Sequence, residues 1–176
     1  MHVYGGGAYP AYLIDAETLR EELLSEEDTR EWLEEVPDDP HAVSFWRMLG
    51  ELDRALAAGR GRLAEQDEGS DSWAAAALRL AHVHHWREEY EEAHRLFDAA
   101  EAVFRGSAGA DDEGPGARMV ALVRQHRAKA LLDEGRPAQA REEAAAALAL
   151  RERLGEDAGL VVSSRQTLDR IERECR

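Results

Sequence analysis

The sequence predicts an all-α protein, and three observations support this. Runs such as WAAAALRLA and REEAAAALALRERL combine alanine, the strongest helix former, with Leu, Arg and Glu. Val and Ile are sparse, and no stretch alternates apolar and polar residues for long enough to indicate a sheet. Glycine and proline clusters divide the chain into pieces of helix length. With 176 residues, 44% of them apolar, we expect one domain with a substantial core.

Charge and cysteine content restrict the classes of function. The net charge of −15 argues against nucleic acid or an anionic membrane surface as the partner. The charge is uneven, because twelve acidic residues and two arginines leave a net −10 on residues 1–39. Cys175 is the single cysteine, so no disulfide can form within the chain. The N-terminus lacks a basic and apolar secretion signal, and we expect a cytoplasmic protein, of bacterial origin to judge from its arginine-rich composition.

Residues 1–39 are expected to form an acidic N-terminal arm and short helices. Residues 1–14, with three successive glycines and three tyrosines, are predicted to be irregular. Helical spacing begins near Ala16. Ser25, followed by Glu-Glu-Asp, is typical of a helix N-cap and predicts a second short helix there.

Residues 40–69 are predicted to be a helix and linker, which could form a degenerate repeat. The helix is expected to run through FWRMLGELDRALAAG and to end at Gly59. EQDEGSDS then breaks the chain, and Ser70, Asp71 or Ser72 can cap the next helix.

Residues 70–176 show two helical pairs and a closing helix. The first pair is AAAALRLAHVHHW and EEYEEAHRLFDAAEAVF, and a flexible acidic loop at Gly106–Gly116 follows it. The second pair is ARMVALVRQHRAKALLDEG and RPAQAREEAAAALALRERLG, separated by a Gly-Arg-Pro turn, and GLVVSSRQTLDRIERECR closes the chain.

The two pairs share a pattern of small and large residues. Two sets align at equal spacing: Ala93, Phe97 and Ala100 in the first pair, and Ala140, Ala144 and Ala147 in the second. This pattern resembles the tetratricopeptide repeat (TPR) family. The resemblance implies a right-handed helical-repeat solenoid of antiparallel helix hairpins with a closing C-terminal helix. The sequence departs from the family pattern at His84, at Ala144 and in the long loop after Phe104.

In that family, one face of each hairpin's first helix lines a concave groove that holds a peptide or a partner helix. Carried onto this chain, the resemblance gives a candidate partner-binding set: Leu78, His82, His85, Trp86, Leu122, Gln125, Lys129, Leu132, Gln166, Arg170 and Arg173. The set gathers cations in an acidic protein, which favours an acidic ligand. The family's lysine–asparagine clamp for chaperone tails is absent, because the chain has no asparagine. We therefore expect a non-enzymatic scaffold or adaptor for another protein, and the acidic N-terminal region could fold back and compete for the groove.

A metal-dependent enzyme or metal sensor using His82 and His85 is the alternative. With Glu89, these histidines have the three- and four-residue spacing of ligands on one helix. The repeat alignment instead places Arg87 and Glu88 at a turn, so Glu89 belongs to the next helix. No HExxH motif, phosphate loop or strained serine turn occurs, and we expect no metal, cofactor or catalytic residue.

A third interpretation is a purely structural subunit. A short solenoid has exposed ends, so a homo-oligomer is also compatible with the sequence.

Overall fold

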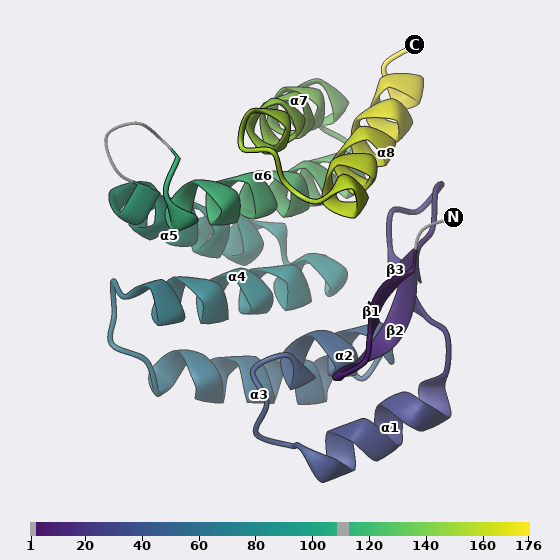
Figure 1. Cartoon of the computed structure of the whole chain (residues 1–176), viewed down its shortest axis with the longest axis vertical. Coiled ribbons are helices and arrows are strands. Elements are labelled where there is room, and N and C mark those ends of the chain that lie inside the picture. The colour runs from purple at the N-terminus through teal and green to yellow at the C-terminus, as the bar shows by residue number, and fades with distance from the viewer. Residues whose placement is uncertain (1–2, 109–112) are drawn as a thin grey trace.

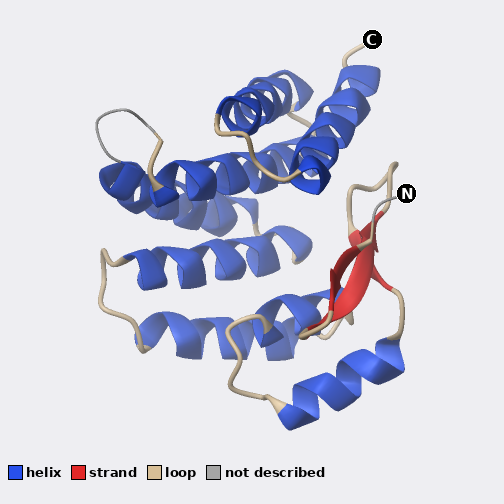
Figure 2. Ribbon diagram, in the orientation of Figure 1, coloured by secondary structure: helices blue, strands red, loops and turns tan. Residues whose placement is uncertain are grey.

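A computed structural model describes residues 3–108 and 113–176 of the chain. Within them lie eight α-helices and a three-stranded antiparallel sheet (Figures 1 and 2). The helices form a stack, and the sheet stands against one side of it, between α8 above and α1 below (Figure 1). In the described part of the chain no helix is both long and apolar enough to cross a membrane.

The N-terminal sheet corrects the expectation of an all-α chain. Strands β1 (Tyr4–Gly6), β2 (Tyr9–Ile14) and β3 (Glu21–Leu23) pair in that order. The predictions of a helix beginning near Ala16 and of an irregular segment at residues 1–14 were therefore wrong. The strands are too short for an alternating pattern to stand out, and three glycines at positive φ allow the chain to turn between β1 and β2.

The loop between β2 and β3 is built on Asp15. Its carboxylate accepts hydrogen bonds from the backbone N–H groups of Thr18, at 2.6 Å, and Glu17, at 3.0 Å. Leu19 follows at a φ of 57°, which non-glycine residues rarely adopt, although its side chain is only 2% exposed. Burial of this leucine therefore fixes a strained backbone in the loop.

Helices α1 (Glu26–Glu35), α2 (Ala42–Met48) and α3 (Leu52–Ala64) follow the sheet. The capping prediction for Ser25 is confirmed, because its side chain accepts from the Asp28 N–H. The predicted stop at Gly59 is wrong, since the break lies at Gly50, where φ is 75°. A Cβ on Gly59 would lie 2.9 Å from Leu80 Cδ1, so this glycine lets α3 approach α4 closely.

The two C-terminal hairpins have the predicted boundaries within a few residues. Helices α4 (Asp71–Trp86) and α5 (Tyr90–Ala108) form the first, and α6 (Pro115–Asp133) and α7 (Pro137–Arg153) form the second. The last helix is α8 (Ala158–Glu174). α5 continues past the predicted loop start at Gly106, and residues 109–112 of that loop lie outside the described residues.

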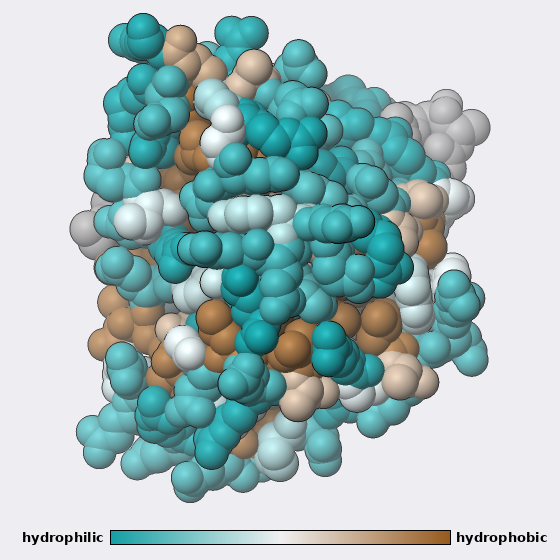
Figure 3. Space-filling model, turned by 180° about the vertical axis from the view of Figure 1, so that it is seen from behind, coloured by the Kyte–Doolittle hydropathy of each residue, from teal (hydrophilic) through white to brown (hydrophobic). Residues whose placement is uncertain are grey.

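Small residues fill the contacts between helices in the two hairpins. Ala81, Ala93, Ala128 and Ala140, which the sequence pattern aligns, are all 0% exposed. From α3 onward each helix packs against the next one in the chain. Seen from behind, the surface is mostly hydrophilic, with apolar residues gathered in a band across its lower half (Figure 3).

Candidate functional site

The predicted face of α4, α6 and α8 does come together in space. Gln125 on α6 donates to Ser163 on α8 at 2.8 Å and accepts from Ser164 at the same distance. His85 on α4 has its Nε2 2.9 Å from the Asp133 carboxylate at the end of α6. These contacts join α4 to α6 and α6 to α8.

This face is covered by the chain's own N-terminal segment, residues 3–24, which we call the arm. Gln166 donates to the carbonyl of Ile14 at 3.2 Å, and Arg170 donates to that of Glu17 at 2.8 Å. Arg173 donates to the Glu17 carboxylate at 2.9 Å. The hypothesis that the acidic N-terminal region folds back is therefore confirmed, whereas its competition with a partner stays a prediction. We call the surface of α2, α4, α6 and α8 beneath the arm the docking face.

A single buried glutamate lies at the centre of this contact. Glu21 on β3 is 7% exposed, and its two oxygens lie 2.9 Å from Arg47 Nη1 and 3.4 Å from Lys129 Nζ. Burial alone would raise the pKa of Glu21, but the charges of Lys129 and Arg47 outweigh it and hold that pKa well below its ordinary value. Burial in turn lowers the pKa of Lys129, an effect that Glu21 opposes. One carboxylate thus faces two cations inside the protein.

Trp86 forms a second contact between the arm and the docking face. The guanidinium of Arg47 lies 4.4 Å from the centre of its ring, and that of Arg20, from the arm, lies 5.0 Å away. Arg20 also lies 3.9 Å from Asp133. The Arg20 side chain is 43% exposed, so its cation–π contact with Trp86 makes a modest contribution to holding the arm.

Most of the predicted partner-binding residues are buried or partly buried in the folded chain. Five are buried: Leu78, His82, His85, Gln125 and Lys129. Five are partly buried: Trp86, Leu122, Leu132, Gln166 and Arg170. Only Arg173 is exposed. The arm contacts six of these residues, and a ligand can take over those contacts only if the arm leaves: His82, Trp86, Lys129, Gln166, Arg170 and Arg173.

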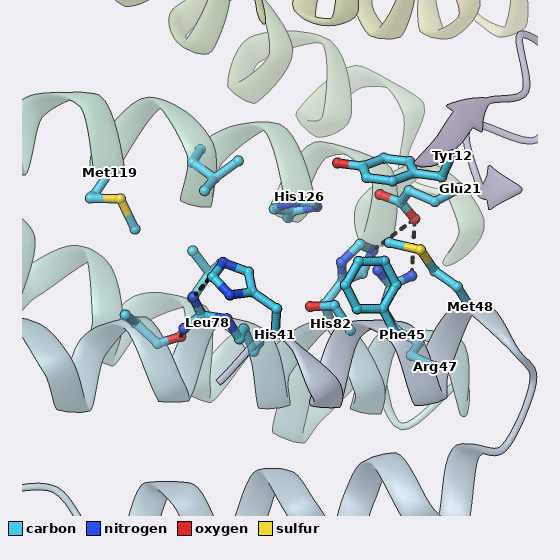
Figure 4. A pocket seen from close by; sticks show the side chains of 14 residues that line it. Tyr12, Glu21, His41, Phe45, Arg47, Met48, Leu78, His82, Met119 and His126 are labelled. Carbon is cyan, nitrogen blue, oxygen red and sulfur yellow. Dashed lines mark hydrogen bonds and ion pairs between the residues drawn. The ribbon is translucent and has the colours of Figure 1, made fainter. Parts of the chain in front are cut away.

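Between the arm and helices α2, α4 and α6 lies a cavity of about 220 Å³, which we call the inner pocket (Figure 4). Phe45, Met48, Leu78, Met119 and Leu122 supply its apolar wall. Its polar lining consists of Tyr12, Glu21, His41, Ser44, Arg47, Arg79, His82 and His126. Burial, reinforced by Glu21, raises the pKa of Tyr12 to about 12.

Two imidazoles of the inner pocket lie close together. The ring centres of His82 and His126 are 4.2 Å apart. Burial lowers the pKa of both well below the ordinary value, helped by the charges of Arg47 at His82 and of Lys129 at His126. Both rings are therefore neutral near pH 7, with one donor and one acceptor nitrogen each.

These histidines and Glu21 form the group among the described residues that best fits a metal ion, with ligand atoms within 4.8 Å of one another. The predicted pair was His82 with His85 instead. His85 is engaged with Asp133, and Glu88 turns the chain at a φ of 62°, which separates Glu89 from the helix of His82. Both oxygens of Glu21 already face cations, so a metal ion would meet two positive charges beside its carboxylate ligand. The arrangement therefore disfavours a metal site.

Several important residues of the site were absent from the predicted set: Glu21, Arg47, Arg79 and His126. Arg47 was missed because residues 40–59 were treated as one helix. Glu21 lies on a strand that the sequence did not predict. For His126, the signal was present in its position one turn after Leu122 and three residues before Lys129, on the same stretch of α6.

The chain matches no protein-family model, and no curated protein or solved structure shows significant similarity to it. The functional proposal therefore depends on the geometry of the site.

Proposed function

We propose that this chain is a non-enzymatic adaptor of TPR-like architecture whose docking face binds an acidic segment of another protein. The arm would be a built-in occupant that the partner displaces. The observation that carries the proposal is the buried Glu21 carboxylate, held by Arg47 and Lys129 from two different helices.

The occupant indicates the chemistry that the docking face accepts. One carboxylate enters a cationic centre, and a second, on Glu17, meets Arg173 at the edge. Main-chain carbonyls of the arm accept hydrogen bonds from the side chains of Gln166 and Arg170. Every peptide segment has such carbonyls, so these contacts do not depend on the occupant's sequence. Charge-assisted hydrogen bonds of this kind favour an acidic ligand over a neutral one.

The arm has features of a segment that can exchange. It carries the strained Leu19 backbone, and three of its contacts with α8 involve exposed or partly exposed arginine and glutamine side chains. A three-stranded sheet of such short strands is marginally stable by itself, so its order depends on docking. A partner of matching charge therefore competes with contacts of moderate strength.

Proteolytic release of the arm tests the proposal. A protease site inserted between Leu24 and Ser25 would allow the folded full chain to be cut, leaving the arm bound without a covalent link. A labelled peptide of residues 1–24 should then exchange into the docking face, measured by fluorescence anisotropy. An unrelated peptide of alternating Glu and Leu should displace it, and a Lys–Leu peptide should not.

Two peptide variants separate specific from general charge effects. Glu21→Gln in the labelled peptide should weaken binding at least tenfold, whereas Glu22→Gln should bind as the original does, because Glu22 is exposed. An arm that never exchanges after cleavage would refute the adaptor proposal and favour the purely structural interpretation.

A further inference from the structure

We propose that the inner pocket binds a small organic carboxylate with an apolar body and a hydroxyl group at the end remote from the carboxylate. This function is separate from the adaptor function, because it requires the arm to stay in place.

The size and lining of the inner pocket suit such a molecule. Its volume is about 220 Å³. The apolar wall comes from three helices, and Phe45 on α2, Leu78 on α4 and Met119 on α6 are labelled among its lining residues (Figure 4). Small-molecule sites typically combine an apolar wall with a few converging polar groups.

Two polar atoms in this pocket lack hydrogen bonds, although His82 Nε2 lies 4.0 Å from a carboxylate oxygen of Glu21. His82 Nε2 and His126 Nδ1 are buried, and neither has a hydrogen-bond partner among the described residues. A buried polar atom without a partner is unfavourable, so such atoms are usually paired with a ligand or water. A hydroxyl group can both donate and accept, and it can therefore pair with two neutral imidazoles whichever nitrogen carries each proton.

Arg79 supplies the charge that selects a carboxylate. Its guanidinium donates to the Ala75 carbonyl at 3.1 Å and lies 3.4 Å from His41 Nε2. Within the described parts of the chain no carboxylate forms an ion pair with it, and Asp39, the nearest acidic influence, pairs with His41 instead. Burial lowers the pKa of Arg79, although not enough to discharge a guanidinium. An arginine in this position is a ready partner for an anion.

The charge balance of the pocket also favours a carboxylate ligand. Glu21 is the single acidic residue in the lining, and Arg47 and Lys129 already offset it. Arg79 therefore leaves the pocket with excess positive charge, which favours an anion and opposes a metal ion at Glu21, His82 and His126.

The test uses 4-hydroxyphenylacetate as the probe with the intact chain, by isothermal titration calorimetry. We expect saturable binding at one site. The uncharged amide of the probe, 4-hydroxyphenylacetamide, should bind at least tenfold more weakly, because it lacks the charge that Arg79 recognises. Phenylacetate, which lacks the hydroxyl, should bind more weakly than the probe.

Arg79→Gln should abolish the preference for the acid over the amide while leaving the affinity for the amide unchanged. Retained amide binding also shows that this variant is folded. Arg95→Gln is the matched control, because Arg95 is exposed and pairs with Glu92, and it should keep the full preference. The proposal is overturned by failure of the acid to bind, by equal affinity for acid and amide, or by a preference that survives Arg79→Gln. Stoichiometric Zn²⁺ binding that excludes the probe would instead establish a metal site.

Discussion

Replacing Glu21 with Gln removes the negative charge that pairs with Arg47 and Lys129, and among the described residues no other carboxylate forms an ion pair with these two buried cations. Breaking a buried pair by removing one partner costs about 3–5 kcal/mol, because the remaining charge is still desolvated. We therefore expect Glu21→Gln to lower the free energy of unfolding by about 3–5 kcal/mol. Glu22→Gln, an identical change at the exposed neighbour, should change it by less than about 0.5 kcal/mol.

Substituting a partner cation tests how much each ion pair of Glu21 contributes to stability. Arg47 is the closer partner, so Lys129→Met leaves one complete pair and should cost less than Glu21→Gln. The double variant Glu21→Gln/Lys129→Met completes a double-mutant cycle and has only one unpaired cation, Arg47. Its free energy of unfolding should exceed the value expected from adding the two single changes by about 1–3 kcal/mol. Urea denaturation at pH 7, followed by far-UV circular dichroism, measures the unmodified chain and the four variants. Equal stabilities of Glu21→Gln and Glu22→Gln would refute the reasoning, as would strict additivity in the cycle.

Three further predictions concern strain, packing and pH. At Leu19, φ is positive, so Leu19→Gly should be more stable than Leu19→Ala by about 1 kcal/mol in the same assay; the opposite order would contradict a left-handed backbone there. In α3, Gly61→Ala should raise the free energy of unfolding by about 0.5–1 kcal/mol, because the new Cβ meets no neighbouring atom. Gly59→Ala should not stabilise, because its Cβ would lie 2.9 Å from Leu80 Cδ1. Equal gains for the two variants would contradict the packing of α3 on α4. Because burial lowers the pKa of His82 and His126, the unfolded chain binds more protons below about pH 6.5, and stability should fall as pH drops through that value, by up to about 2.7 kcal/mol per pH unit. Urea midpoints at pH 7 and 5.5 test this, and equal midpoints would contradict it.

The two C-terminal hairpins were predictable because local signals agreed with the packing. Ser70 caps α4 as expected, Glu88 turns the chain where the alignment placed a turn, and small residues occur where the helices approach closely. Charge suggested the docking of the arm as a hypothesis, since an acidic segment and a cationic face belong to the same chain.

The structure of the arm was not predictable from the same signals. Glu21 and Glu22 are identical neighbours, and only the alternation of side chains along β3 directs one inward and the other to solvent. That strand has three residues, too few for a periodic pattern. Its order comes from pairing with β2 and from contacts with helices more than 100 residues away, which no local pattern encodes.

Amide hydrogen exchange of residues 12–24 in the intact chain tests the central claim most directly. Isolated sheets of this size are marginal in water, so lasting protection of these amides requires the arm to be docked. The structure predicts protection at Asp15 and Leu24, whose N–H groups donate to the carbonyls of Arg20 and Ala11, and this protection should be lost in Glu21→Gln and kept in Glu22→Gln. Exchange at the rate of an unstructured peptide in the unmodified chain would contradict it.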